Sequence, residues 1–190
     1  RGAFEYQGQK CSAASRAFVP KSVWQRMGDD FLGATGELSY GDVTDLSNYG
    51  GAVIDARAFA KNVKAIERAK CGPSVTVAAG GEYDDSEGYF IRPTVLLSDD
   101  PTDEAFRDEY FGPILAVHVF PDDKYDEILD VVDHGSKYAL TGSVIADDRA
   151  AVLKTSERLR NAAGNFYVND KPTGAVVGQQ PFGGARASGT

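Results

Sequence analysis

Residues 112–120, GPILAVHVF, form a nearly continuous apolar run that limits the folds open to this chain. Such a run is typical of a strand that is buried on both faces of a parallel sheet. Other predicted elements surround it: strands at 16–20, 74–81, 88–97, 139–146 and 163–170, and helices at 21–34, 53–70, 125–135 and 148–160. Strand and helix alternate over most of the second half. This pattern predicts an α/β fold, a three-layer α/β/α sandwich with a mostly parallel sheet.

The clearest helical pattern lies at 53–70. Its apolar spacing predicts Ile54, Phe59, Val63 and Ile66 on one side, with Cys71-Gly72-Pro73 as the stop. The small residues 12–17 can also start a helix, directly after a cysteine. The sequence therefore predicts helices in the first half as well.

Composition excludes several classes of partner. The 190 residues carry a formal net charge of -8, which would repel nucleic-acid phosphates and anionic lipids. No apolar run is long enough to span a bilayer. Two cysteines cannot form a metal cluster and indicate a reducing compartment, and neither His118 nor His134 has a ligand partner at suitable spacing. We therefore expect no metal, no nucleic acid and no membrane.

Cys11, after Gly8, Gln9 and Lys10, is the first candidate for chemistry. If a helix begins there, its N-terminus and the charge of Lys10 would favour the thiolate, the reactive form of cysteine. Nearby backbone amides could then stabilise an oxyanion on an attacked carbonyl. The alternative is a buried structural cysteine. For Cys71, at a helix end, the structural interpretation is the stronger.

The second candidate is DEYFGP, residues 108–113, which directly precedes the buried strand. Gly112 and Pro113 fix a tight turn that places Glu109 and Phe111 at the start of the strand, facing a cleft. An acidic side chain there suits hydrogen bonds to ribose hydroxyls, and an aromatic ring suits packing against a nicotinamide. The alternative is a solvated acid beside a core phenylalanine.

The third candidate is the glycine-rich tail that follows the last predicted strand, residues 171–189. Its glycines permit exposed backbone N–H groups, which can bind a carboxylate. The alternative is a flexible linker. Phe182, between Pro181 and Gly183, indicates a segment that packs on something instead.

Three motifs in this order, GQKC at 8–11, EYFGP at 109–113 and PFGGARASG at 181–189, resemble the catalytic domain of the aldehyde dehydrogenase superfamily. The likeness covers essentially the whole chain. Finer segments such as GQKCSAASR, LRNAAGNFYVNDK and TGAVVGQQPFGGARASGT are similar to one branch, the Δ1-pyrroline-5-carboxylate dehydrogenases. This resemblance implies an aldehyde dehydrogenase-type fold and NAD-dependent oxidation of L-glutamate γ-semialdehyde to L-glutamate in proline catabolism.

The resemblance also implies individual roles. Cys11 would attack the aldehyde to give a thiohemiacetal and then a thioester. Glu109 would hold the nicotinamide ribose, and Phe111 would pack near the ring. The residues that match substrate-binding positions are Ser12, Gly174, Ala175 and Phe182. Ala175 is serine in some relatives, so a hydroxyl would be missing there while backbone donation would remain.

The same resemblance implies that residues 1–190 are the thiol-bearing domain of a longer, homo-oligomeric enzyme. The NAD-binding domain, the general-base glutamate and the oxyanion-hole asparagine would lie upstream, so this stretch alone is expected to be inactive. A functional link to proline dehydrogenase follows. So does a location in the bacterial cytoplasm or, in a eukaryote, the mitochondrial matrix.

Three alternatives stay open. An enzyme for another ω-semialdehyde, such as succinate semialdehyde, would share the thiol chemistry but lack a site for an α-amino group. A cysteine hydrolase would need a histidine base near Cys11, with His118 and His134 as the candidates. A non-catalytic scaffold would keep the fold without the reaction, although the intact motifs argue against it.

Overall fold

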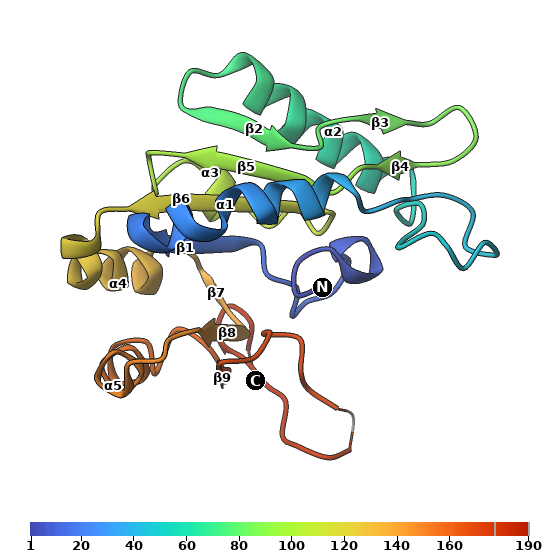
Figure 1. Cartoon of the computed structure of the whole chain (residues 1–190). Coiled ribbons are helices and arrows are strands. Elements are labelled where there is room, and N and C mark those ends of the chain that lie inside the picture. The colour runs from blue at the N-terminus through green and yellow to red at the C-terminus, as the bar shows by residue number, and fades with distance from the viewer. Residues whose placement is uncertain (177, 190) are drawn as a thin grey trace.

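A four-stranded sheet forms the centre of the computed structural model, which describes residues 1–176 and 178–189 (Figure 1). The strand order is β1-β6-β5-β2. The strands are β1 (Arg16–Pro20), β6 (Ile114–Phe120), β5 (Thr94–Ser98) and β2 (Val75–Ala79). β6 pairs in parallel with both β1 and β5, and β2 closes the edge antiparallel to β5. The predicted, mostly parallel sheet is confirmed.

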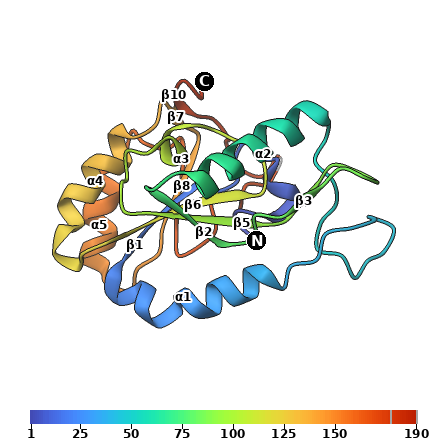
Figure 2. The same cartoon turned by 90° about the horizontal axis from the view of Figure 1, so that it is seen from above.

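Helices cover both faces of this sheet, as the view from above shows (Figure 2). α1 (Lys21–Gly36) lies on one side of the strands. α2 (Ala56–Cys71) and the short α3 (Glu104–Arg107) lie on the other. α4 (Tyr125–His134) follows β6 after a 3-10 turn, η2 (Asp122–Lys124). The three-layer α/β/α prediction is therefore confirmed.

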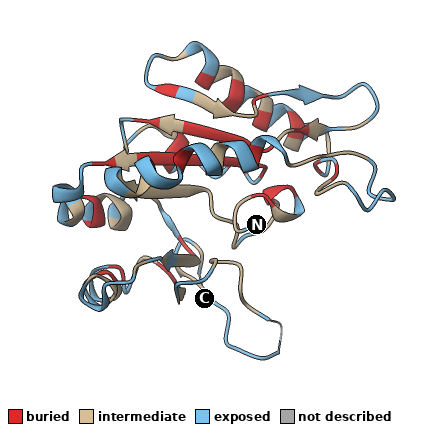
Figure 3. Ribbon diagram, viewed as in Figure 1, coloured by how far each residue is buried: buried red, intermediate tan, exposed pale blue. Residues whose placement is uncertain are grey.

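Alternate residues of β6 enter two separate cores. Ile114 and Ala116 join a cluster with residues of α2 and α3, whereas Leu115 and Val117 join a cluster with residues of α1. Successive side chains of a strand point to opposite faces, so an apolar run of this kind buries both. Figure 3 shows the buried residues concentrated in these central strands.

The C-terminal part of the chain lies below the sheet in Figure 1. Its elements are β7 (Tyr138–Ala139), β8 (Thr141–Val144), α5 (Arg149–Arg158), β9 (Asn165–Val168) and β10 (Ala185–Arg186). β8 and β9 are parallel, and β10 pairs antiparallel with β7. The strand predicted at 139–146 is thus two short strands, and β9 is not the last strand.

Smaller elements complete the fold. They are η1 (Glu5–Gly8), a 3-10 segment, and a hairpin of β3 (Tyr83–Asp84) and β4 (Phe90–Ile91). Pro93 follows β4 and precedes β5, at the predicted bend. No helix in the described part of the chain has the length and apolarity needed to cross a membrane.

The predicted apolar side of α2 is wrong at its first residue. Ile54 precedes the helix and is 82% exposed, because Asp55 is the N-cap and accepts a hydrogen bond from Ala58 N. Phe59 and Ile66 are buried as predicted. Asn62, a polar residue between them, is buried as well.

Candidate functional site

Cys11 lies exposed on a loop between η1 and β1. The helix predicted after it does not form: Ala13 N donates to Lys10 O in a turn, and Ala14 N donates to Gly2 O. Ser15 O already accepts from Ala116 N, which commits the chain to the sheet. The proposed activation of the thiol by a helix N-terminus is therefore wrong, but the buried structural cysteine is excluded too.

The charge of Lys10 is also directed elsewhere. Its Nζ lies 2.8 Å from Glu5 Oε2. This ion pair, with a smaller effect of Lys171, holds the pKa of Glu5 below its usual value. Lys10 therefore helps to fold η1 onto the loop, and its charge is shared with Glu5.

Glu109 and Phe111 lie on an exposed turn before β6. Phe111 has a left-handed φ of 52° and is 40% exposed, and its N–H donates to Glu109 Oε1 at 2.9 Å. Desolvation by the surrounding protein raises the pKa of Glu109 above 4.5, and the Phe111 N–H and Lys61 oppose that rise. The alternative of a core phenylalanine at this position is excluded, because 40% of Phe111 is exposed to solvent.

Two glycines, Gly8 at the end of η1 and Gly112 in this turn, allow their backbones to approach closely. Gly8 has a φ of +64°, and a Cβ placed on it would lie 2.2 Å from Gly112 O. A side chain at position 8 would meet both a steric clash and an unfavourable backbone conformation. The first two sequence motifs are therefore in direct backbone contact.

The 109–112 turn is also held from α2. Asn62 Nδ2 donates to Ala58 O at 2.9 Å and to Tyr110 O at 3.5 Å. A Cβ on Gly112 would lie 2.1 Å from Asn62 Oδ1, an atom with no hydrogen-bond partner among the described residues. The side chain of Asn62 thus fills the space that the missing side chain of Gly112 leaves.

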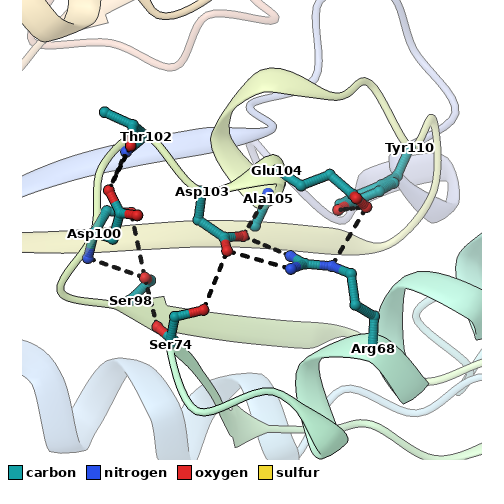
Figure 4. A network of polar contacts seen from close by, with 9 residues as sticks. All are labelled: Arg68, Ser74, Ser98, Asp100, Thr102, Asp103, Glu104, Ala105 and Tyr110. Atoms are coloured by element: carbon teal, nitrogen blue, oxygen red, sulfur yellow. Dashed lines mark hydrogen bonds and ion pairs between the residues drawn. The ribbon is translucent and has the colours of Figure 1, made fainter.

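A polar network anchors the same turn from a second point (Figure 4). Arg68 of α2 binds Asp103, the N-cap of α3, with an Nη2–Oδ1 distance of 2.5 Å. Arg68 Nε lies 3.3 Å from Glu104, which accepts a hydrogen bond from the hydroxyl of Tyr110. Burial, with the charge of Glu104, raises the pKa of Tyr110 to about 12, so this hydroxyl remains a donor.

The glycine-rich tail lies against one face of β9. A Cβ on Gly174 would lie 3.1 Å from a ring atom of Tyr167. Gly183 N donates to Asn165 Oδ1, and Asn165 Nδ2 donates to Pro181 O. Phe182, between these two anchors, is 47% exposed. The linker interpretation is excluded for this part of the tail, which is hydrogen-bonded on both sides of the ring.

Two further contacts join the C-terminal part of the chain to the segments around Cys11. Thr141 Oγ1, at the start of β8, donates to Ser12 O at 3.4 Å. A Cβ on Gly2 would lie 3.5 Å from Lys171 Cβ, three residues before Gly174. These contacts place the start of the tail, at Lys171, and the start of β8 against segments on either side of Cys11.

This region is at the amino ends of the parallel strands. Cys11 precedes β1, the 109–112 turn precedes β6, and Ser12 contacts the first residue of β8. Ligands in open α/β sheets usually bind at the carboxyl ends of the strands, so this site lies at the end opposite to the usual one. The two hollows between α3 and the C-terminal end of α4, which include Arg107 and His134, contain none of the predicted site residues.

Three residues that hold this site were not predicted from the sequence: Asn62, Asn165 and Tyr167. Asn62 had a recognisable signal, because it is a polar residue within an otherwise apolar helix face. Asn165 had a weaker one, since asparagine is disfavoured in strands. Tyr167 had none, because an aromatic residue in a strand is ordinary.

Comparison with known proteins gives one consistent result. The model of the aldehyde dehydrogenase family matches residues 1–190. The mitochondrial delta-1-pyrroline-5-carboxylate dehydrogenase of Mus musculus is 52% identical over 191 residues, which cover 100% of this chain and 34% of that protein.

Solved structures agree. The Mycobacterium tuberculosis delta-pyrroline-5-carboxylate dehydrogenase bound with NAD has a TM-score of 0.92 and 74% identity, over 100% of this chain and 34% of that one. The 1-pyrroline-5-carboxylate dehydrogenase from Thermus with bound NAD has a TM-score of 0.85 and 36% identity, over 100% and 35%. The chain thus spans about a third of the length of the relatives it matches.

Proposed function

Because the chain belongs to the aldehyde dehydrogenase family, we propose that it is the thiol-bearing catalytic domain of an NAD-dependent enzyme that oxidises L-glutamate γ-semialdehyde to L-glutamate. The observation that carries this proposal is the exposed Cys11 on a loop that follows Gly8, whose backbone lies directly against Gly112 of the 109–112 turn. The names of the relatives, which are pyrroline-5-carboxylate dehydrogenases, support the choice of substrate. Proline catabolism is the corresponding role.

Cys11 acts as the nucleophile. Its Sγ bonds to the aldehyde carbon to give a thiohemiacetal, and oxidation leaves a thioester that water hydrolyses to glutamate. NAD, when bound, would accept the hydride released in this oxidation. Exposure of the thiol on a loop suits its attack on a carbonyl carbon.

Glu109 and Phe111 fit the nicotinamide ribose end of NAD. One carboxylate oxygen of Glu109 accepts from Phe111 N, and a carboxylate retains acceptor capacity for ribose hydroxyls. The exposed ring of Phe111 offers a flat apolar surface for packing. These two residues would hold and orient the cofactor next to the thiol.

The tail holds the substrate. Gly174 and Ala175 offer backbone N–H groups to the α-carboxylate, Phe182 packs along the aliphatic chain, and Ser12 contributes from the Cys11 loop. Support comes from the attachment of the tail to β9 on either side of Phe182. It also comes from the contact between Thr141 and Ser12.

We further propose that the chain is one part of a longer enzyme, because it spans 34% of its relatives' length. The NAD-binding domain would precede it. A homo-oligomer, a functional link to proline dehydrogenase, and a cytoplasmic or mitochondrial-matrix location are part of the same proposal. The mitochondrial designation of the Mus musculus relative supports the last point for a eukaryotic source.

The test uses the full-length enzyme and NADH formation. L-Glutamate γ-semialdehyde should give a kcat/KM at least roughly a hundredfold above that of succinate semialdehyde, because polar groups built for the α-amino acid end are left unpaired by the other substrate. Cys11→Ala should lower kcat by about three orders of magnitude or more.

Cys71→Ala is the matched control and should retain wild-type kinetics. Equal kcat/KM for the two semialdehydes would support the broader ω-semialdehyde interpretation instead. Hydrolysis of acyl esters that depends on His118 or His134, without NADH formation, would support a hydrolase.

A further inference from the structure

Asn165, the first residue of β9, forms side-chain hydrogen bonds with the main chain on both sides of Phe182. Its Nδ2 donates to Pro181 O at 3.0 Å, and its Oδ1 accepts from Gly183 N at 3.2 Å. An amide side chain offers one donor group and one acceptor, and here each is matched to the opposite group of the tail. The two hydrogen bonds fix the backbone that carries the Phe182 ring.

Gly164, directly before Asn165, packs closely against the backbone of the tail. A Cβ on Gly164 would lie 1.8 Å from Gly183 O and 2.7 Å from Gly184 Cα. Gly164 N is itself bonded to the carbonyls of Ala139 and Leu140. The turn that follows Phe182 is therefore pressed directly onto the start of β9.

Tyr167 serves the other half of the tail from the same strand face. Residues i and i+2 of a strand point to the same side, so Asn165 and Tyr167 share one face of β9. The Tyr167 ring contacts Gly174, and its hydroxyl accepts from Gln180 Nε2 at 3.3 Å. One strand face thus sets the spacing between the Gly174–Ala175 segment and the Phe182 turn.

From this geometry we propose that Asn165 is a positioning residue, which fixes Phe182 along the aliphatic chain of the substrate and so contributes to selectivity for the semialdehyde. The inference rests on the proposed function. The side-chain hydrogen bonds of Asn165 go only to the residues on either side of Phe182, so we expect the effect of changing this side chain at the substrate end of the site.

The test is Asn165→Asp in the full-length enzyme, with Asn169→Asp as the matched control. Asn169 lies just beyond β9 and makes the same pair of amide hydrogen bonds, to Ala146 N and O, away from the Phe182 turn. Each change keeps the acceptor and replaces the donor by an oxygen that faces a carbonyl. The two variants therefore suffer the same chemical loss at different places.

Asn165→Asp should raise KM for L-glutamate γ-semialdehyde, and Ki for the product L-glutamate, by roughly tenfold, the usual effect of losing one such hydrogen bond. KM for NAD and the rate of Cys11 alkylation by iodoacetamide should stay at wild-type values. Asn169→Asp should leave all four quantities unchanged.

A double-mutant cycle with Phe182→Leu separates positioning from general damage. If Asn165 acts through Phe182, the two changes in log KM will be strongly non-additive, whereas independent effects would add. If Asn165→Asp does not accumulate as folded protein, Asn165→Thr replaces it, because threonine suits a strand but cannot bridge both groups.

A wild-type KM for the semialdehyde in a folded Asn165 variant, or additivity with Phe182→Leu, would overturn this inference but leave the proposed function intact. Absence of semialdehyde-dependent NADH formation by the wild-type enzyme would overturn the proposed function and this inference with it.

Discussion

At the scale of single residues, the backbone contact between Gly8 and Gly112 is the most demanding feature of the site. Gly8→Ala should destabilise the protein by about 2 kcal/mol or more, since the new methyl group meets the Gly112 carbonyl at a positive φ. Gly33→Ala is the control, because a Cβ there meets nothing within 4 Å and alanine favours the helix by about 0.5–1 kcal/mol.

Urea unfolding monitored by circular dichroism would measure both changes. If the urea midpoints of both variants were lower than that of the wild type, or both were higher, the proposed steric role of Gly8 would be contradicted. Because Gly8 ends η1 and lies three residues before Cys11, a folded Gly8→Ala variant should show altered Cys11 alkylation, whereas Gly33→Ala should not.

At the scale of elements, the junction of α2, β2, β5 and α3 depends on one partly buried ion pair. Burial alone would raise the pKa of Asp103, but the hydrogen bonds from Arg68 and from Ala105 N outweigh it and hold that pKa below 3.8. A carboxylate whose pKa is lower in the folded than in the unfolded state stabilises the fold at pH values above its unfolded-state pKa. The contribution is lost as the pH falls from about 3.8 through the lower folded-state pKa.

Asp103→Asn keeps a good N-cap for α3 but removes the charge. We expect it to lower the free energy of unfolding at pH 7 by about 1–3 kcal/mol, below the figure for a fully buried pair because Arg68 is partly exposed. The loss should shrink as the pH falls below 3.8. Denaturant titrations across that range measure it, and a loss independent of pH would contradict the account. Glu127→Gln, in the exposed Lys124 pair, is the control.

The sequence was sufficient for most elements of the fold. The apolar run of β6 required burial on both faces, and the helices at α1, α2, α4 and α5 followed from their spacing. Two expectations were wrong for local reasons. Asp55 begins α2 after Ile54, and sheet pairing by Ser15 O draws the small residues after Cys11 away from a helix.

The supports of the site could not be predicted in the same way. Asn62 acts on Tyr110 across 48 residues of sequence, and Asn165 acts on Pro181 and Gly183 across 16 and 18. Tyr167 binds Gln180, which lies 13 residues further along the chain. Local propensity carries no information about such partners. They depend on which strand face the fold turns toward which loop, and this is known only once the topology is formed.

At the scale of the whole molecule, the cofactor should be held only in part by these 190 residues. Within this chain the proposed contacts with NAD are Glu109 and Phe111. A ligand stabilises the folded state by RT ln(1 + [L]/Kd), so millimolar NAD should leave the melting temperature of the isolated chain unchanged but raise that of the full-length enzyme. Differential scanning fluorimetry measures both. A clear NAD-dependent shift, or turnover, by the isolated chain would refute this prediction.

The carboxyl ends of the parallel strands lie opposite the candidate site. There β1 runs directly into α1 and β6 into η2, and Ser22 N donates to Asp122 across the gap. None of the proposed catalytic or cofactor-holding residues lies at these carboxyl ends. Residues 121–124 are exposed, so an affinity tag or fluorophore attached beside this turn should leave the geometry of Cys11 and Glu109 unchanged.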